Sequence, residues 1–122
     1  MISIIDYGLG NLSAFASAYH QLQIPYEIVS NAEKLKDPSH IILPGVGSFD
    51  GAMKKISDSG FDEVLTYYVK EKEVMVLGVC IGLQIMCKES EEGKMKGLSW
   101  IDAETVKIRN DNLSGRKLKL PH

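Results

Sequence analysis

Short apolar runs alternate with amphipathic stretches along residues 1–88. The apolar runs are rich in isoleucine, valine and leucine and end in turn residues, which is typical of buried strands. They occupy residues 2–6, 26–30, 40–43 and 74–77. Strands that alternate with helices imply β–α units, and therefore a parallel sheet covered by helices.

The stretches between the apolar runs have helical spacing. Leu12, Phe15 and Tyr19 recur along one helix face, and Pro25 marks the end of this helix. The helices expected are residues 12–22, a short one at 31–35, two pieces within 50–71 broken near Ser59 and Gly60, and one that opens with residues 82–87.

The pattern changes after residue 88. Residues 105–109 and 117–120 alternate apolar and charged positions, which indicates half-exposed antiparallel strands joined by a turn at 110–115. The predicted fold class is therefore α/β, an open and mostly parallel sheet with flanking helices, incomplete, and with an antiparallel C-terminal appendage. We expect residues 1–122 to form the N-terminal portion of a single domain.

The composition fits one soluble domain and narrows its partners. Of 122 residues, 44% are hydrophobic and 25% charged, and the net charge of −2 indicates neither nucleic acid nor a membrane as partner. The chain lacks both the roughly 18 apolar residues of a bilayer span and the basic start of a secretion signal. Its two cysteines, Cys80 and Cys87, would lie about 10 Å apart on a helix, which is too far for a disulfide. Unpaired thiols favour a cytoplasmic location.

A cysteine between two glycines follows the fourth strand, in the sequence Gly78-Val79-Cys80-Ile81-Gly82 (the elbow, residues 78–82). This is the spacing of a nucleophile elbow, a tight strand-to-helix turn at the sheet edge where ligands bind. Glycine at 78 and 82 leaves room for the turn, and the helix start favours a thiolate. The N–H of Ile81 could stabilise an oxyanion. The alternative is a small core residue packed between glycines.

A second glycine-bearing turn, "PGVG" (the glycine loop, residues 44–47), follows the third strand. Because both strands belong to one sheet, its N–H groups could lie beside Cys80 and supply a second oxyanion donor. The alternative is a turn that needs only small residues. Gln84 lies one helical turn beyond Cys80 and is either a pocket residue or an exposed helix residue.

The segments "IIDYGLGNL", "ILPGVGSF", "LGVCIGLQIM", "SEEG" with a later "GL", and "LPH" occur in the order and spacing of class I (triad-type) glutamine amidotransferases. The chain resembles this family over its whole length, and most closely the glutaminase subunits of imidazole glycerol phosphate synthases. The Gly-x-Cys-x-Gly motif is shared by the class, whereas "DYGLGNL" with "PGVGSF" is specific to this subunit type. Relatives that amidate sugars for surface polysaccharides share these motifs.

The resemblance implies that Cys80 attacks the side-chain amide of glutamine, forms a thioester and releases ammonia. It also implies an edge, including Asn11, that contacts a (β/α)8-barrel cyclase in histidine biosynthesis. No cofactor and no metal are implied. The further residues implied are Gly45, Gly47 and Gln84 for glutamine binding, Val46 (whose peptide must flip), Gly47 and Ile81 for the oxyanion hole, and Gly78 and Gly82 for the elbow.

The base half of the family's triad is missing from these 122 residues, because no His-x-Glu segment occurs. His20 is expected to be a plain helix residue, and His40 to lie at the sheet edge opposite Cys80. His122 matches a segment that precedes the family's catalytic histidine, and the acidic run 89–92 is expected on a solvated face. We therefore expect negligible glutaminase activity, since losing a triad partner costs several orders of magnitude.

The sequence leaves alternatives to a glutaminase portion open. One is a non-catalytic module that keeps the partner surface, and another is an amidotransferase subunit for surface-sugar biosynthesis. A different cysteine chemistry, such as a thiol hydrolase, is disfavoured because no histidine is expected near Cys80.

Overall fold

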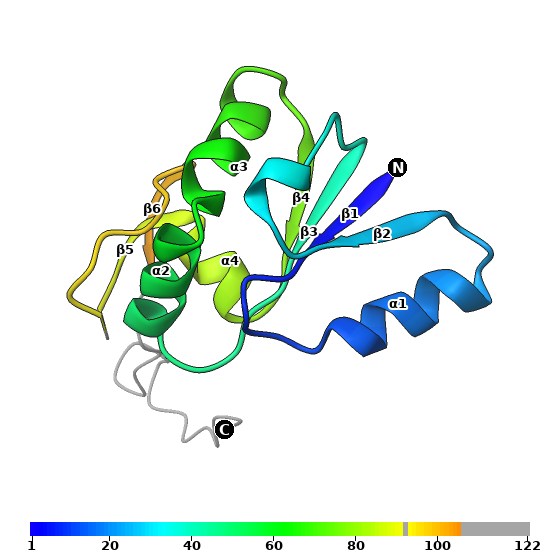
Figure 1. Cartoon of the computed structure of the whole chain (residues 1–122). Coiled ribbons are helices and arrows are strands. Elements are labelled where there is room, and N and C mark those ends of the chain that lie inside the picture. The colour runs from blue at the N-terminus through cyan, green and yellow to red at the C-terminus, as the bar shows by residue number, and fades with distance from the viewer. Residues whose placement is uncertain (92, 106–122) are drawn as a thin grey trace, which may run out of the picture.

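The computed structural model describes residues 1–91 and 93–105 and shows a parallel sheet with helices on both faces (Figure 1). Its strands, in the order β2-β1-β3-β4, are β1 (Ile2–Ile5), β2 (Tyr26–Val29), β3 (His40–Leu43) and β4 (Met75–Gly78). The helical elements are α1 (Leu12–Gln21), the 3-10 turn η1 (Ala32–Lys34), α2 (Phe49–Asp58), α3 (Phe61–Lys70) and α4 (Ile81–Ile85). A second sheet pairs β5 (Cys87–Ser90) with β6 (Ile101–Thr105).

The predicted α/β class is confirmed, and so is the break between α2 and α3. All ladders of the main sheet are parallel, with Ile4 paired to Ile28 on one side and to Ile42 on the other. Gly60 ends the connection between α2 and α3 with a φ of 78°, a left-handed conformation that glycine adopts without strain.

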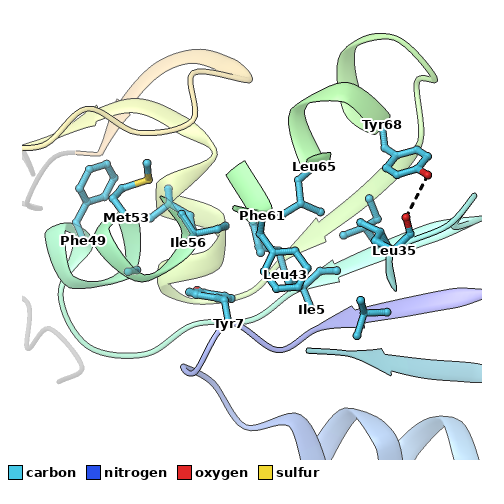
Figure 2. Packing of buried hydrophobic residues seen from close by; sticks show 14 residues of the cluster. Ile5, Tyr7, Leu35, Leu43, Phe49, Met53, Ile56, Phe61, Leu65 and Tyr68 are labelled. Atoms are coloured by element: carbon cyan, nitrogen blue, oxygen red, sulfur yellow. Dashed lines mark hydrogen bonds between the residues drawn. The ribbon is translucent and has the colours of Figure 1, made fainter. Parts of the chain in front are cut away.

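The main core lies between the sheet and the layer of α2, α3 and α4. Alternate strand residues such as Ile5, Ile41 and Leu43 point into it and meet Ile56 and Leu65 of the helices (Figure 2). These five side chains are fully buried. Burial of a side chain of this size stabilises the fold by about 1.5 to 3 kcal/mol, so this layer is the main source of stability.

The other face of the sheet is only partly covered. One row across it consists of Ile28, Ile4, Ile42 and Leu77; Ile4 and Ile42 are buried, whereas Ile28 and Leu77 are 45% and 54% exposed. Helix α1 packs beside β2 and has no fully buried residue (Figure 1). A hollow of about 340 Å³ remains beside it, lined by Ile2, Tyr19, His40, Ile41, Ile42, Met75, Val76 and Leu77.

The second sheet differs from the antiparallel strands that the sequence predicts after residue 88. Its ladder is parallel, with Cys87 opposite Ile101, and a single antiparallel bridge joins Glu89 to Lys96. The antiparallel strands predicted for the C-terminal end fall, from residue 106 onward, outside the described residues.

The expectation that residues 82–87 are helical is wrong for the last two of these residues. Helix α4 stops at Ile85, and Cys87 begins β5. The carbonyls of Ile85, Met86 and Cys87 accept hydrogen bonds from residues 98–101 instead of from a continued helix. The indole of Trp100 donates to Thr66 Oγ1 at 2.9 Å and ties this segment to α3. Tertiary contacts therefore override the local helical pattern.

Candidate active site

The loops that follow β1, β3 and β4 meet at the carboxyl edge of the main sheet (Figure 1). A Cβ placed on Gly10 would lie 2.7 Å from Pro44 Cβ, and one placed on Gly45 would lie 3.0 Å from Gly82 N. The Asn11 loop, the glycine loop and the elbow are thus in direct contact, as parallel strand ends require.

Cys80 occupies a strained turn between β4 and α4. Its φ of 56° and ψ of −124° lie outside the regions that residues with a Cβ favour. The residue is exposed, and its thiol is free. A side chain held out of the sheet by a strained backbone is the geometry of a nucleophile elbow. The catalytic role of Cys80 stays a prediction.

The two elbow glycines are required by close packing. A Cβ on Gly78 would approach Leu83 Cα to 2.7 Å and Met86 Sδ to 2.6 Å. A Cβ on Gly82 would overlap the Leu43 carbonyl oxygen. Both positions exclude a side chain because the start of α4 lies directly against β4 and β3.

The predicted oxyanion donors belong to two segments in contact, since a Cβ on Gly45 would lie 3.4 Å from Ile81 Cβ. Within the part of the chain that the structure describes, the N–H groups of Val46, Gly47 and Ile81 donate no hydrogen bond. Val46 and Gly47 are exposed, and Gly47 has a φ of 94° with open space around it. An oxyanion needs N–H groups that are free to donate, and the assignment of these three to that role stays a prediction.

Two other predicted residues have local structural roles. Asn11 caps α1, since its Oδ1 accepts hydrogen bonds from Ala14 N at 3.3 Å and Ser13 Oγ at 3.1 Å. Gln84 is half-buried on α4, and its backbone N donates to Cys80 O. Partner contact by Asn11 and substrate contact by Gln84 remain predictions.

The described histidines lie away from Cys80. His20 is exposed on α1, and His40 is exposed at the amino end of β3, opposite the edge that carries the elbow. His122 lies outside the described residues. Residues 1–91 and 93–105 contain no group of three His, Cys, Asp or Glu side chains that could hold a metal ion. In the same residues, no helix has the length and apolarity to cross a membrane.

Two side chains, one buried and one bound by backbone N–H groups, were not anticipated from the sequence. The Tyr7 hydroxyl donates to Pro44 O at 2.6 Å, directly under the glycine loop. Asp50, in the first turn of α2, accepts hydrogen bonds from the backbone N–H groups of Lys94 and Met95. A tyrosine directly after a strand, within "DYGLG", was the available signal for the first. Nothing local signals the second, because its partners lie more than 40 positions away.

Comparisons with known proteins agree on one family. The sequence model of the CobB/CobQ-like glutamine amidotransferase domain matches residues 6–117. The imidazole glycerol phosphate synthase subunit HisH of Leptospira interrogans is 48% identical over 111 residues, which are 91% of this chain and 54% of that protein. HisH of Bdellovibrio bacteriovorus is 44% identical over 90% of this chain and 54% of its own length. HisH of Bacillus subtilis is 38% identical over 100% of this chain and 58% of its own.

A solved structure shows the same fold at lower sequence identity. A crystal structure of a glutamine amidotransferase superposes with a TM-score of 0.72 at 22% identity, over 95% of this chain and 59% of that one. The chain therefore spans little more than half the length of the relatives it matches.

Proposed function

We propose that this chain, which belongs to the CobB/CobQ-like family of class I glutamine amidotransferases and is HisH-like, carries the nucleophile half of a glutaminase site. In this proposal, residues 1–122 are the N-terminal portion of a glutaminase domain that supplies ammonia to a synthase in histidine biosynthesis. The observation that carries the proposal is the strained, exposed Cys80 in an elbow that contacts the glycine loop, whose Val46 and Gly47 N–H groups donate no hydrogen bond within the described residues.

The reaction proceeds through a thioester. The Cys80 thiolate attacks the side-chain amide carbon of glutamine, and the carbonyl oxygen becomes an oxyanion near the N–H groups of Val46, Gly47 and Ile81. The carbon–nitrogen bond then breaks, and the nitrogen leaves as ammonia after it gains a proton. Water hydrolyses the thioester to glutamate and regenerates the thiol. Gly45, Gly47 and Gln84 hold the glutamine.

The partner is a (β/α)8-barrel cyclase that docks on the edge with Cys80 and the Asn11 loop. The name of the relatives, a subunit of imidazole glycerol phosphate synthase, supports a partner of this kind. Both cysteines are free thiols, which favours a cytoplasmic location.

Covalent capture of Cys80 tests the proposal. We expect a chloroketone analogue of glutamine to alkylate Cys80 much faster than Cys87, at a rate that glutamine reduces by competition. Peptide mass spectrometry measures both labels, and Cys80→Ala removes the first. Equal labelling of the two thiols, or no protection by glutamine, would contradict a glutamine site.

Ammonia release separates the complete reaction from the half site. We expect the 122-residue chain to release negligible ammonia from glutamine, because its sequence contains no His-x-Glu segment. Robust release that Cys80→Ala abolishes would overturn that expectation.

A non-catalytic module that only binds the partner is the second candidate. It shares the docking edge, and the capping of α1 by Asn11 shows that this loop is ordered by its own contacts. It predicts complex formation with a cyclase but no glutamine-protected labelling of Cys80, so the capture experiment distinguishes the two.

A further inference from the structure

We propose that Tyr7 is a positioning residue that holds the glycine loop against the elbow, through the hydrogen bond from its hydroxyl to Pro44 O. The inference rests on the proposed glutaminase site, because it concerns the loop that carries two of the oxyanion donors. Tyr7 does not touch the reacting atoms; it acts through the Pro44 carbonyl.

The Tyr7 side chain is fixed by its surroundings. The residue is 6% exposed and lies beside Ile5 and Leu43 in the core (Figure 2). The turn in which it sits is itself tied, since Asp6 accepts hydrogen bonds from Gly8 N at 3.1 Å and Ser30 Oγ at 3.0 Å. The Tyr7 hydroxyl that donates to the glycine loop is therefore carried by a side chain and a turn that are both held in place.

Two consecutive carbonyls, at the end of β3 and the start of the glycine loop, accept hydrogen bonds from different parts of the molecule. Leu43 O accepts a hydrogen bond from Val79 N of the elbow at 3.0 Å. Pro44 O accepts one from Tyr7 at 2.6 Å. The elbow and the β1 turn thus fix the direction in which the loop leaves β3.

Gly45 is enclosed between the same two partners. A Cβ at this position would overlap the Tyr7 hydroxyl and would lie 3.0 Å from Gly82 N. The residues beyond it are unconstrained, because Val46 is 51% exposed and Gly47 has no atom within 4 Å of its Cβ position. The hydrogen bond therefore anchors the peptide that precedes the pair of residues whose N–H groups must face the oxyanion.

The hydroxyl can serve only as a donor, because its partner is a carbonyl oxygen. Burial raises the pKa of Tyr7 to about 12, so the proton stays on the oxygen throughout the neutral range. Phenylalanine fills the same space and leaves Pro44 O without its partner.

Tyr7→Phe and Tyr68→Phe form a matched pair for the test. Tyr68 is also buried, and its hydroxyl donates to the backbone carbonyl of Leu35 at 3.3 Å, far from the elbow (Figure 2). Both variants lose one buried hydroxyl that donates to a carbonyl, and Tyr68→Phe also loses the hydrogen bond that this hydroxyl accepts from Asp37 N at 3.0 Å. A merely structural effect should therefore be at least as large in Tyr68→Phe as in Tyr7→Phe.

The first readout is the rate at which the glutamine chloroketone labels Cys80, divided by the rate with iodoacetamide. Labelling by iodoacetamide needs no loop, so the ratio isolates recognition of the carbonyl. We expect Tyr7→Phe to lower this ratio about fivefold to tenfold, the worth of one hydrogen bond, and Tyr68→Phe to leave it within about twofold. An unchanged ratio in Tyr7→Phe, or an equal fall in both, would overturn the inference.

The second readout needs no glutamine. Hydrogen exchange of the Val79 amide reports the bond between the elbow and Leu43 O, and Tyr7→Phe should speed this exchange about tenfold while Tyr68→Phe does not. If wild-type Cys80 reacts with iodoacetamide but not with the chloroketone, the proposed function fails. In that case Val79 exchange still decides whether Tyr7 positions the loop, and unchanged exchange rejects it.

Discussion

Cys80 combines an exposed, free thiol with an unfavourable backbone. Its left-handed φ of 56° costs about 1 to 3 kcal/mol for a residue with a Cβ, and the same turn leaves the thiol exposed. The sequence indicated this feature through the two glycines that flank the cysteine. The strain itself became visible only with the backbone angles.

Replacing Cys80 with glycine should therefore stabilise the protein. We expect Cys80→Gly to raise the free energy of unfolding by about 1 to 2 kcal/mol, since glycine adopts the angles at this position without strain. Cys80→Ala keeps the Cβ and should change stability by less than about 0.5 kcal/mol. Urea unfolding followed by circular dichroism measures all three proteins.

Cys87 supplies the control for this experiment. It lies in β5, where there is no backbone strain for glycine to relieve, so Cys87→Gly should lower the free energy of unfolding by about 0.5 to 1 kcal/mol. A loss of stability in Cys80→Gly similar to that in Cys87→Gly would show that the elbow is not strained.

At the scale of elements, one carboxylate joins two distant segments. Both Asp50 oxygens at the start of α2 accept from Lys94 N, at 3.0 and 2.9 Å, and Oδ1 also accepts from Met95 N at 2.9 Å. Position 93 must be glycine for this approach, since a Cβ there would lie 2.6 Å from Asp50 Oδ1. The contact links the helix that follows the glycine loop to the connection between β5 and β6.

This contact should loosen in acid. The backbone hydrogen bond from Lys94, followed by that from Met95, lowers the pKa of Asp50 below its ordinary value of 3.8. The contribution to stability is therefore complete above that value and is lost as pH falls through the lower pKa of the folded state. We expect the amide resonances of Lys94 and Met95 to titrate together below pH 3.8.

Asp50→Asn provides the comparison, because it keeps the shape of the side chain and removes its charge. The two amide resonances should then lose their acid titration and exchange faster with solvent at neutral pH. Titration that persists in Asp50→Asn would assign it to another carboxylate.

The elements that the sequence predicted well are those whose pattern is local. The strand β3 and the break at Gly60 follow from apolar runs and turn residues, and the elbow follows from its glycine spacing. The end of α4 could not be predicted, because it depends on hydrogen bonds from residues 98–101. The Tyr7 bond to Pro44 O likewise joins positions 37 apart, for which a single sequence has no periodic signal.

At the scale of the whole molecule, β4 is an edge strand without the usual protection. Within the described residues it pairs with β3 alone, and it contains neither a charge nor a proline. Met75 is 71% and Leu77 is 54% exposed on the face that α1 leaves open. Edges of this kind pair with other chains.

We therefore expect the 122-residue chain to self-associate at micromolar concentration and Met75→Lys to suppress this. A lysine on an edge strand opposes pairing through its charge. Leu22→Lys, at the end of α1, adds the same charge to a side chain that is 67% exposed and serves as the control. Sedimentation velocity over a concentration series measures both, and equal suppression by the two variants would point to net charge rather than to the edge.

The chain has a single tryptophan, Trp100, and its indole is held against Thr66 of α3. This contact gives the protein a built-in optical probe. The emission wavelength of the indole reports whether residues 98–101 lie on the helix layer, whereas circular dichroism reports the helices as a whole. A red shift that precedes the loss of helical signal during unfolding would show that residues 98–101 release the carbonyls at the end of α4 before the helices unfold.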